Sequence, residues 1–213
     1  MEYGAASAVA RWTDQGKQVA YLLVTRGEAG IASMPPDEVA PIRAEEQRAS
    51  CAAVGVTELA FLDHRDGLVE ASLGLRRDLA EAIRRNRPDV VLSINFRDSW
   101  GGPSWNHVDH RNVGVALLDA VRDAGNPWIF DDAGAAWGGV RFVAFLGSPN
   151  ATHAVDVSGH LDRGVESLRR HALYLANLGD GSTDPDAFLR GAAEAGGRRM
   201  GVRYACAFEV LTP

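Results

Sequence analysis

The sequence predicts an α/β fold in which a mostly parallel sheet is covered by helices on both faces. Short apolar runs alternate with longer segments of helical periodicity along the whole chain, a pattern typical of β-α-β units. One run, residues 19–24, is apolar without interruption, as expected for a strand covered on both faces. No repeat, low-complexity tract or linker divides the 213 residues. We therefore expect a single domain over residues 1–213.

The first elements have clear local boundaries. A helix is predicted over residues 3–15, and it ends at Gly16, because glycine readily adopts the left-handed conformation found at helix ends. After the strand at 19–24, a second helix is predicted from about Pro41 to Val54, where Gly55 closes it.

The middle of the chain continues the alternation. Residues 59–62 form a short predicted strand, and Ser72 is a suitable N-cap for a helix that runs to Arg85. Pro88 prevents this helix from continuing. The apolar run at 90–94 is the next predicted strand.

The second half of the chain predicts further helices and strands. An apolar-periodic helix covers residues 113–121, and the alternating segment 140–146 is a strand. Ser158 is predicted to cap a long helix that reaches Asn177.

The two ends of the chain differ. Near the C-terminus, Thr183 and Asp186 have the spacing of a capping box for a last helix, and residues 204–211 form a closing strand. The N-terminus starts directly at a helix, although a β-α-β unit needs a strand before its crossover helix. Either this helix is an addition to the sheet, or the first strand is missing because the chain lacks its natural beginning.

Composition excludes several classes of partner. The net charge of −6, without any run of Lys or Arg, argues against a nucleic-acid surface. No segment approaches the roughly 18 apolar residues of a membrane span, so no membrane partner is expected. Two cysteines without a CxxC pattern favour a reduced, cytoplasmic setting. Oligomeric state cannot be read from the pattern.

The segment His107-Val108-Asp109-His110 carries the most chemistry. It follows the strand at 90–94, and open α/β sheets place their ligands at the carboxyl ends of strands. Neutral imidazole is the commonest metal ligand, and a neighbouring carboxylate can fix its tautomer. Bland alternatives exist for each residue: a helix-start histidine bonded to the backbone for His110, a solvated loop histidine for His107, and a helix N-cap for Asp109.

The order of several motifs resembles the LmbE-like, or PIG-L, family of zinc-dependent N-deacetylases, and the resemblance covers essentially the whole chain. The motifs that carry it are the loop Thr25–Gly30, Arg43-x-x-Glu46, Arg65-Asp66-Gly67, His107-x-Asp109-His110 and Tyr204–Phe208.

This resemblance implies a Rossmann-like fold and a hydrolase that removes acetyl from an N-acetylated amino sugar or its conjugate. It makes His110 a zinc ligand. The family's other two ligands and its general base come from an N-terminal His-Pro-Asp-Asp motif, which is absent from this sequence. Because one histidine holds zinc weakly, the chain as written is expected to bind zinc weakly or not at all and to be poorly active. A start codon assigned too late, a truncation and a true pseudoenzyme are the alternatives.

The resemblance also implies roles for four further residues. His107 would stabilise the tetrahedral oxyanion or protonate the leaving amine, and Asp109 would orient His107. Arg43 and Asp66 would face the substrate. The alternative for Arg43 is a helix pair with Glu46, and for Asp66 an ordinary turn.

Other residues are ambiguous or assigned to the fold. Trp100 and Trp105 could stack on a sugar ring or pack against their own loop. His153, His160 and His171 are predicted to be structural.

Two functions from different classes therefore remain: a deacetylase acting on a small N-acetylamino-sugar, and an inactive sugar-binding pseudoenzyme of the same fold. A nucleotide-binding Rossmann protein is disfavoured, because the sequence contains neither GxGxxG nor GxxxxGK.

Overall fold

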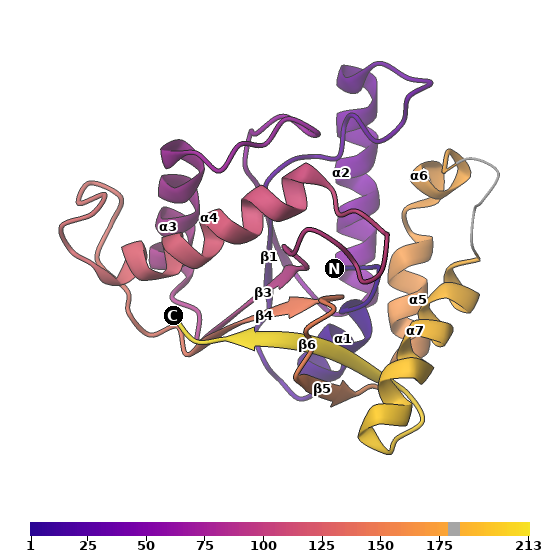
Figure 1. Ribbon diagram of the computed structural model, residues 1–213. Coiled ribbons are helices and arrows are strands. Elements are labelled where there is room, and N and C mark those ends of the chain that lie inside the picture. The colour runs from indigo at the N-terminus through magenta and orange to yellow at the C-terminus, as the bar shows by residue number, and fades with distance from the viewer. Residues whose placement is uncertain (179–183) are drawn as a thin grey trace. The chain divides into compact units, whose positions relative to one another are not determined.

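A computed structural model describes residues 1–178 and 184–213 (Figure 1). Its helices are α1 (Ala6–Asp14), α2 (Pro36–Ala53), α3 (Leu73–Asn86), α4 (Val108–Gly125), α5 (Leu161–Arg169), α6 (Ala172–Ala176) and α7 (Pro185–Met200). Its strands are β1 (Ala20–Leu23), β2 (Glu58–Phe61), β3 (Val90–Ile94), β4 (Phe142–Leu146), β5 (His153–Asp156) and β6 (Ala205–Leu211). The α/β class predicted from the sequence is confirmed.

The chain forms two compact units, and each is discontinuous in sequence. Unit 1 contains Met1–Asp66 and Ala154–Ala207, and unit 2 contains Gly67–His153 and Phe208–Pro213. Strand β6 begins in unit 1 and ends in unit 2.

In unit 1, helix α5 packs against α1, α2 and α7. The contact with α1 is close, because a Cβ at Gly164 would lie 2.0 Å from the Ser7 hydroxyl. The core between these helices is built from fully buried valines such as Val9, Val39 and Val165. Strands β1 and β2 pair in parallel, with Ala20 opposite Glu58.

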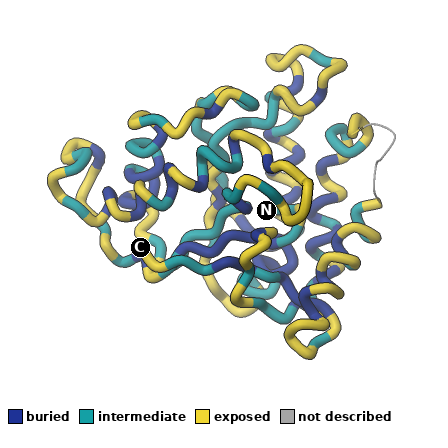
Figure 2. Tube along the Cα trace, viewed as in Figure 1, coloured by how far each residue is buried: buried dark blue, intermediate teal, exposed yellow. Residues whose placement is uncertain are grey.

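In unit 2, α3 packs against α4, and β3 pairs in parallel with β4. Strand β4 in turn pairs antiparallel with β6, with Leu146 opposite Phe208. Four of the five residues of β4 are buried, which places this strand in the core of the unit (Figure 2). The sheet is therefore mixed, because the closing strand runs against its neighbour.

Buried Arg84 joins the two helices of unit 2. Its guanidinium donates to the carbonyl oxygens of Asp123 and Ala124 at the end of α4, at 3.0 and 3.2 Å, and to carbonyls in the loop that follows. The last carbonyl oxygens of a helix have no hydrogen-bond donor within the helix. The Arg84 guanidinium therefore provides the donors for the end of α4.

Strands β1 and β3 each have a free edge in the described residues, as do β2 and β5. Within residues 1–178 and 184–213, β1 pairs only with β2, and β3 pairs only with β4. The expected absence of a first strand stays a prediction, since β1 and β3 belong to different units.

Several local predictions are confirmed. Ser72 caps α3 by accepting a hydrogen bond from the Leu75 amide at 3.2 Å. Gly16 and Gly55 follow the ends of α1 and α2 with φ of +77° and +76°. Strand β3 has the predicted bounds.

The predicted start of α2 was wrong, because Pro41 lies inside this helix and not at its beginning. A proline there removes one intrahelical donor, while Pro36 at the first turn and the acidic residues Asp37 and Glu38 favour an earlier start.

The single helix predicted from Ser158 to Asn177 was also wrong. The segment forms α5 and α6 with a break at His171, whose ψ of +53° is not helical. The Ser158 hydroxyl does not cap α5, and instead donates to the Asp156 carboxylate at 2.6 Å. The buried imidazole of His171 is bound to the neighbouring helix, and this tertiary contact is absent from the local pattern.

Three further differences concern single elements. Strand β5 was not predicted. Strand β1 is not covered on both faces, since Leu22 is 36% exposed. Thr183 lies outside the described residues, and the N-cap of α7 is Asp184, whose carboxylate accepts from the Asp186 amide.

Candidate functional site

Helix α4 begins inside the HxDH segment and fixes the positions of its histidines. His107 is the N-cap, and its Nδ1 accepts a hydrogen bond from the Asp109 amide at 3.2 Å. The N-cap position leaves the His107 side chain exposed. His110 lies one turn into the helix, and the two imidazole centroids are 5.5 Å apart.

His110 is half-buried, and two neighbours hold its ring. Its Nδ1 lies 3.0 Å from Oδ1 of Asn106, and Trp100 packs against it at 5.8 Å between ring centroids. Burial, with a smaller contribution from the nearby His107, lowers the pKa of His110 to about 4. The imidazole is therefore neutral at neutral pH, which is the form that binds metals.

The role predicted for Asp109, to orient His107, stays a prediction. The Asp109 carboxylate accepts from the backbone amides of Gly67 and Val69, at 2.7 and 3.1 Å. The backbone amide of Asp109, not its carboxylate, contacts His107. Asp109 is also not the N-cap, because that position is held by His107, two residues before it. Asp109 thus ties the loop after Asp66 to the first turn of α4.

Asp66, in unit 1, is more than an ordinary turn residue. Its carboxylate accepts from the Thr25 hydroxyl and from the Ala29 amide, both at 3.0 Å, and its own amide donates to Glu28 at 2.8 Å. These bonds join the loop after β1 to the loop after β2. A carboxylate offers about four acceptor sites, so Asp66 can still bind a hydroxyl.

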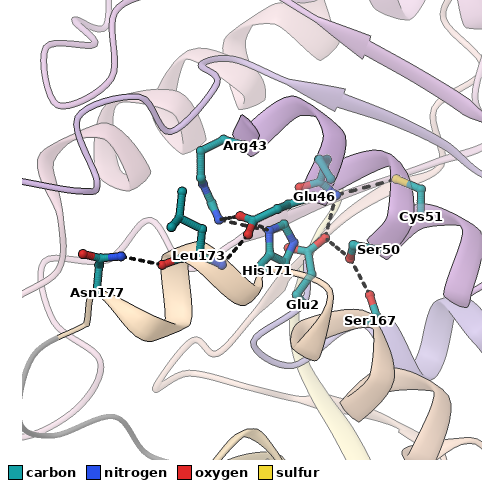
Figure 3. A network of polar contacts seen from close by, with 10 residues as sticks. Glu2, Arg43, Glu46, Ser50, Cys51, Ser167, His171, Leu173 and Asn177 are labelled. Carbon is teal, nitrogen blue, oxygen red and sulfur yellow. Dashed lines mark hydrogen bonds and ion pairs between the residues drawn. The ribbon is translucent and has the colours of Figure 1, made fainter. Parts of the chain in front are cut away.

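Arg43 lies in a largely buried polar network of unit 1 (Figure 3). Its Nη1 donates to Glu46 at 2.9 Å and to Nδ1 of His171 at 3.0 Å, and its guanidinium lies 4.3 Å from the centre of the Tyr174 ring. The helix pair with Glu46 is therefore present. Because the Arg43 side chain is only 15% exposed, its charge is partly committed within the protein.

Glu2 extends the same network. Its carboxylate accepts from Gln47 at 2.8 Å, and Ser50, which bonds it at 3.4 Å, also lies 2.7 Å from Ser167. Burial alone would raise the pKa of Glu2, but the N-terminal ammonium, His171 and Gln47 outweigh burial and lower this pKa to about 2. His171, predicted to be structural, is buried within this network.

The two tryptophans before His107 differ. Trp100 contacts the His110 ring, whereas Trp105 is 68% exposed and lies under the Arg111 guanidinium at 4.9 Å. The two cysteines are buried and free. Among the helices that the structure describes, none is long and apolar enough to cross a membrane.

The structure gathers part of the predicted site. His107, Asp109 and His110 lie together in unit 2, while Arg43 and Asp66 lie in unit 1. No group of three or more His, Cys, Asp or Glu side chains that could hold a metal ion occurs among the described residues. The sequence analysis did not single out Asn106. Its position four residues before His110, at the start of a helix, could have indicated a contact between the two side chains.

Comparisons with known proteins place this arrangement in a family. Residues 1–121, which include the HxDH segment, match the PIG-L family, described as GlcNAc-PI de-N-acetylase. Diacetylchitobiose deacetylase of Thermococcus kodakarensis is 29% identical, over 95% of this chain and 75% of its own. A 1D-myo-inositol 2-acetamido-2-deoxy-alpha-D-glucopyranoside deacetylase of Acidothermus cellulolyticus is 26% identical, over 93% of this chain and 81% of its own.

Solved structures agree on the fold. The N,N'-diacetylchitobiose deacetylase of Pyrococcus horikoshii superposes with a TM-score of 0.87 at 24% identity, covering 99% of this chain and 79% of its own. GalB, a 4-carboxy-2-hydroxymuconate hydratase of Pseudomonas putida, superposes at 0.78 with 19% identity, covering 100% of this chain and 91% of its own. Because a deacetylase and a hydratase share this fold, the fold does not identify the family, and the assignment rests on the sequence match, which spans more than half of the chain. This protein belongs to the PIG-L family.

Proposed function

We propose that this protein is a hydrolase that removes the acetyl group from an N-acetylated amino sugar or its conjugate. The observation that carries the proposal is the family match over residues 1–121, which includes both histidines of the HxDH segment. The relatives named above are deacetylases of acetamido sugars, and this supports the substrate class.

His107 is proposed to act on the reacting amide. Attack of water on an acetamide carbon places negative charge on the carbonyl oxygen and later requires a proton on the leaving amine. Because Nδ1 of His107 accepts the Asp109 amide, the neutral ring carries its proton on Nε2, on an exposed side chain. Nε2–H of the neutral ring can donate a hydrogen bond to the oxyanion, whereas transfer of a proton to the amine requires the protonated, imidazolium form of the ring.

Zinc is implied by the resemblance, and His110 is the residue that would bind it. The donor set does not fit a complete catalytic site, because such a site needs about three protein ligands and the described part of the chain brings no such group together. We therefore derive no catalytic step through the metal. A cytoplasmic location and substrate contacts from Arg43 and Asp66 are also part of the proposal.

A second candidate function is sugar binding without catalysis. The incomplete donor set favours it, since a pocket that holds the sugar does not need the metal. Acetate release separates the two functions, because only the hydrolase produces it.

The test compares two preparations: the 213-residue chain, and the same chain with any residues that its gene encodes in frame before Met1. Each is incubated with N,N'-diacetylchitobiose, with and without added zinc, and acetate is measured together with bound metal. The hydrolase predicts acetate release from at least one preparation and its loss in His107→Ala and His110→Ala. Sugar binding measured by calorimetry, without acetate release, supports the binding protein. If neither preparation binds the sugar or releases acetate, both proposed functions are contradicted.

A further inference from the structure

Asn106 is a fully buried amide that lies next to both histidines of the site. The residue is 1% exposed. Its Nδ2 donates to the carbonyl oxygens of Asn95 and Arg97, at 2.7 and 2.9 Å. Its Oδ1 accepts from the backbone amide of His107 at 2.8 Å. All of these residues belong to unit 2.

These contacts determine which way the Asn106 amide points. Carbonyl oxygens only accept hydrogen bonds, so the NH2 group must face Asn95 and Arg97. The reversed amide would place an oxygen against two carbonyls and an NH2 group against the His107 N–H, and all three bonds would be lost. Oδ1 therefore faces His110.

The direction of this amide sets the proton position on His110. Nδ1 of His110 lies 3.0 Å from Oδ1 of Asn106, and an oxygen acceptor requires a hydrogen on that nitrogen. We propose that Asn106 is a positioning residue that holds the neutral His110 imidazole in the Nδ1–H tautomer, so that Nε2 carries the lone pair and can only accept. The tautomer follows from the contacts alone, and its use in a reaction rests on the proposed function.

His107 is held in the opposite tautomer. Its Nδ1 accepts from the Asp109 amide, so its proton is on Nε2. Two imidazoles with centroids 5.5 Å apart thus present different groups. His110 offers an acceptor nitrogen, and His107 offers a donor for an anionic oxygen. Buried Asn106 and the first turn of α4 set this difference before any ligand binds.

The experiment is long-range 1H–15N correlation spectroscopy on 15N-histidine-labelled protein at about pH 8, well above the ordinary histidine pKa of about 6.5. His110→Gln and His107→Gln assign the two rings. We expect His110 to be protonated on Nδ1 and His107 on Nε2. His171 gives an internal reference of the Nε2–H type, because its Nδ1 accepts from Arg43, which can only donate.

Two substitutions at position 106 separate the acceptor from the donors. Asn106→Asp keeps the acceptor for His110 but loses the donors to Asn95 and Arg97, so the tautomer should persist while the unfolding midpoint falls. Asn106→Ala removes the acceptor, and the His110 signal should move toward the Nε2–H tautomer. Asn86→Ala, which removes an exposed amide bonded to the Ala82 carbonyl, should leave all histidine signals unchanged.

An Nε2–H tautomer of His110 in the wild-type protein, or an unchanged tautomer in Asn106→Ala, would overturn the inference. The wild-type and Asn106→Asp spectra decide the question if the alanine variant does not fold. The measurement needs neither metal nor activity. A protein that shows these tautomers but releases no acetate therefore contradicts only the proposed function.

Discussion

The carboxylate of Asp109 illustrates how a residue of the HxDH segment holds the backbone. Both of its oxygens accept amide hydrogens from the loop at Gly67 and Val69. Asp109 and Val69 are buried, so water is a poor substitute partner for the Val69 amide, whereas the bond to the Gly67 amide is only partly buried. Any effect of an Asp109 substitution on activity will therefore include an effect on this loop.

Asp109→Asn is predicted to destabilise the protein by roughly 1–3 kcal/mol, because an amide has one acceptor oxygen and leaves one buried N–H unpaired. Urea unfolding measures the cost, and amide hydrogen exchange at Gly67 and Val69 should become faster. The control is Asp98→Asn, which weakens a surface pair with Arg111 at 3.4 Å and should cost about 0–1 kcal/mol. Equal costs would contradict the role assigned to Asp109.

Glu46→Gln tests the buried network around Arg43. Glu46 accepts from Arg43 at 2.9 Å and from the Leu173 amide at 2.5 Å, with a side chain that is 10% exposed. Removing its charge leaves a largely buried guanidinium without an anion, and we expect a loss of roughly 3–5 kcal/mol in the free energy of unfolding.

The control for this substitution is its neighbour. Glu45 pairs with Arg48 on the exposed side of α2, with side chains that are 75% and 56% exposed. Glu45→Gln should change stability by about 0–1 kcal/mol in the same urea titration. A small effect at both positions would show that the buried pair does not stabilise the fold.

Among the elements, α7 contains two glycines in different surroundings. Gly191 is exposed, and a Cβ added there would meet no atom within 4 Å, whereas a Cβ at Gly196 would lie 2.5 Å from the Ala205 carbonyl oxygen. Helix propensity alone favours alanine at both positions by about 0.5–1 kcal/mol. Packing against the start of β6 reverses the preference at Gly196.

Gly191→Ala is therefore predicted to raise the free energy of unfolding by up to about 1 kcal/mol, and Gly196→Ala to lower it by about 1–3 kcal/mol. Thermal unfolding followed by circular dichroism gives both changes in a single experiment. If both variants gained stability, the close approach of α7 to β6 would be wrong.

For the whole molecule, buried histidines make stability depend on pH. Burial is the main cause that lowers the pKa of His171 and brings that of His110 to about 4. Their pKa values in the unfolded chain are about 6.5. Below pH 6.5 the unfolded chain therefore binds more protons than the folded protein, and stability falls as the solution is acidified.

A second loss of stability follows at lower pH. The Arg97 guanidinium lowers the pKa of the Glu209 carboxyl, so this carboxylate's contribution is present above its ordinary pKa of 4.5 and is lost as the pH falls through its lower, folded-state value. Urea midpoints should be constant between about pH 7 and 8, fall below about 6.5 and fall further below about 4.5. His171→Gln should reduce the slope between about pH 6.5 and 5, and a midpoint that rises on acidification would refute the assignment.

The sequence by itself determined the α/β alternation, the cap at Ser72, the turns at Gly16 and Gly55, strand β3 and the HxDH segment with its family. These features are local, because periodicity, glycine and capping residues act within a few positions of the chain. The start of α2 and the break at His171 were not readable in this way. The start of α2 was misplaced because Pro41 is accepted inside the helix, and the break at His171 accompanies a tertiary contact with α2. Neither feature is visible in the local pattern.

Only the tertiary structure decided the partners of the polar groups. Asp109 bonds amides about 40 residues earlier, and Arg43 meets His171 128 residues later. The antiparallel direction of β6 likewise depends on where the chain returns. Hydrogen bonds between distant segments depend on how the backbone packs. The sequence therefore located the imidazoles of His107 and His110 but not their partners. The contacts of Asn106 and of the first turn of α4 determine which nitrogen of each ring carries the proton.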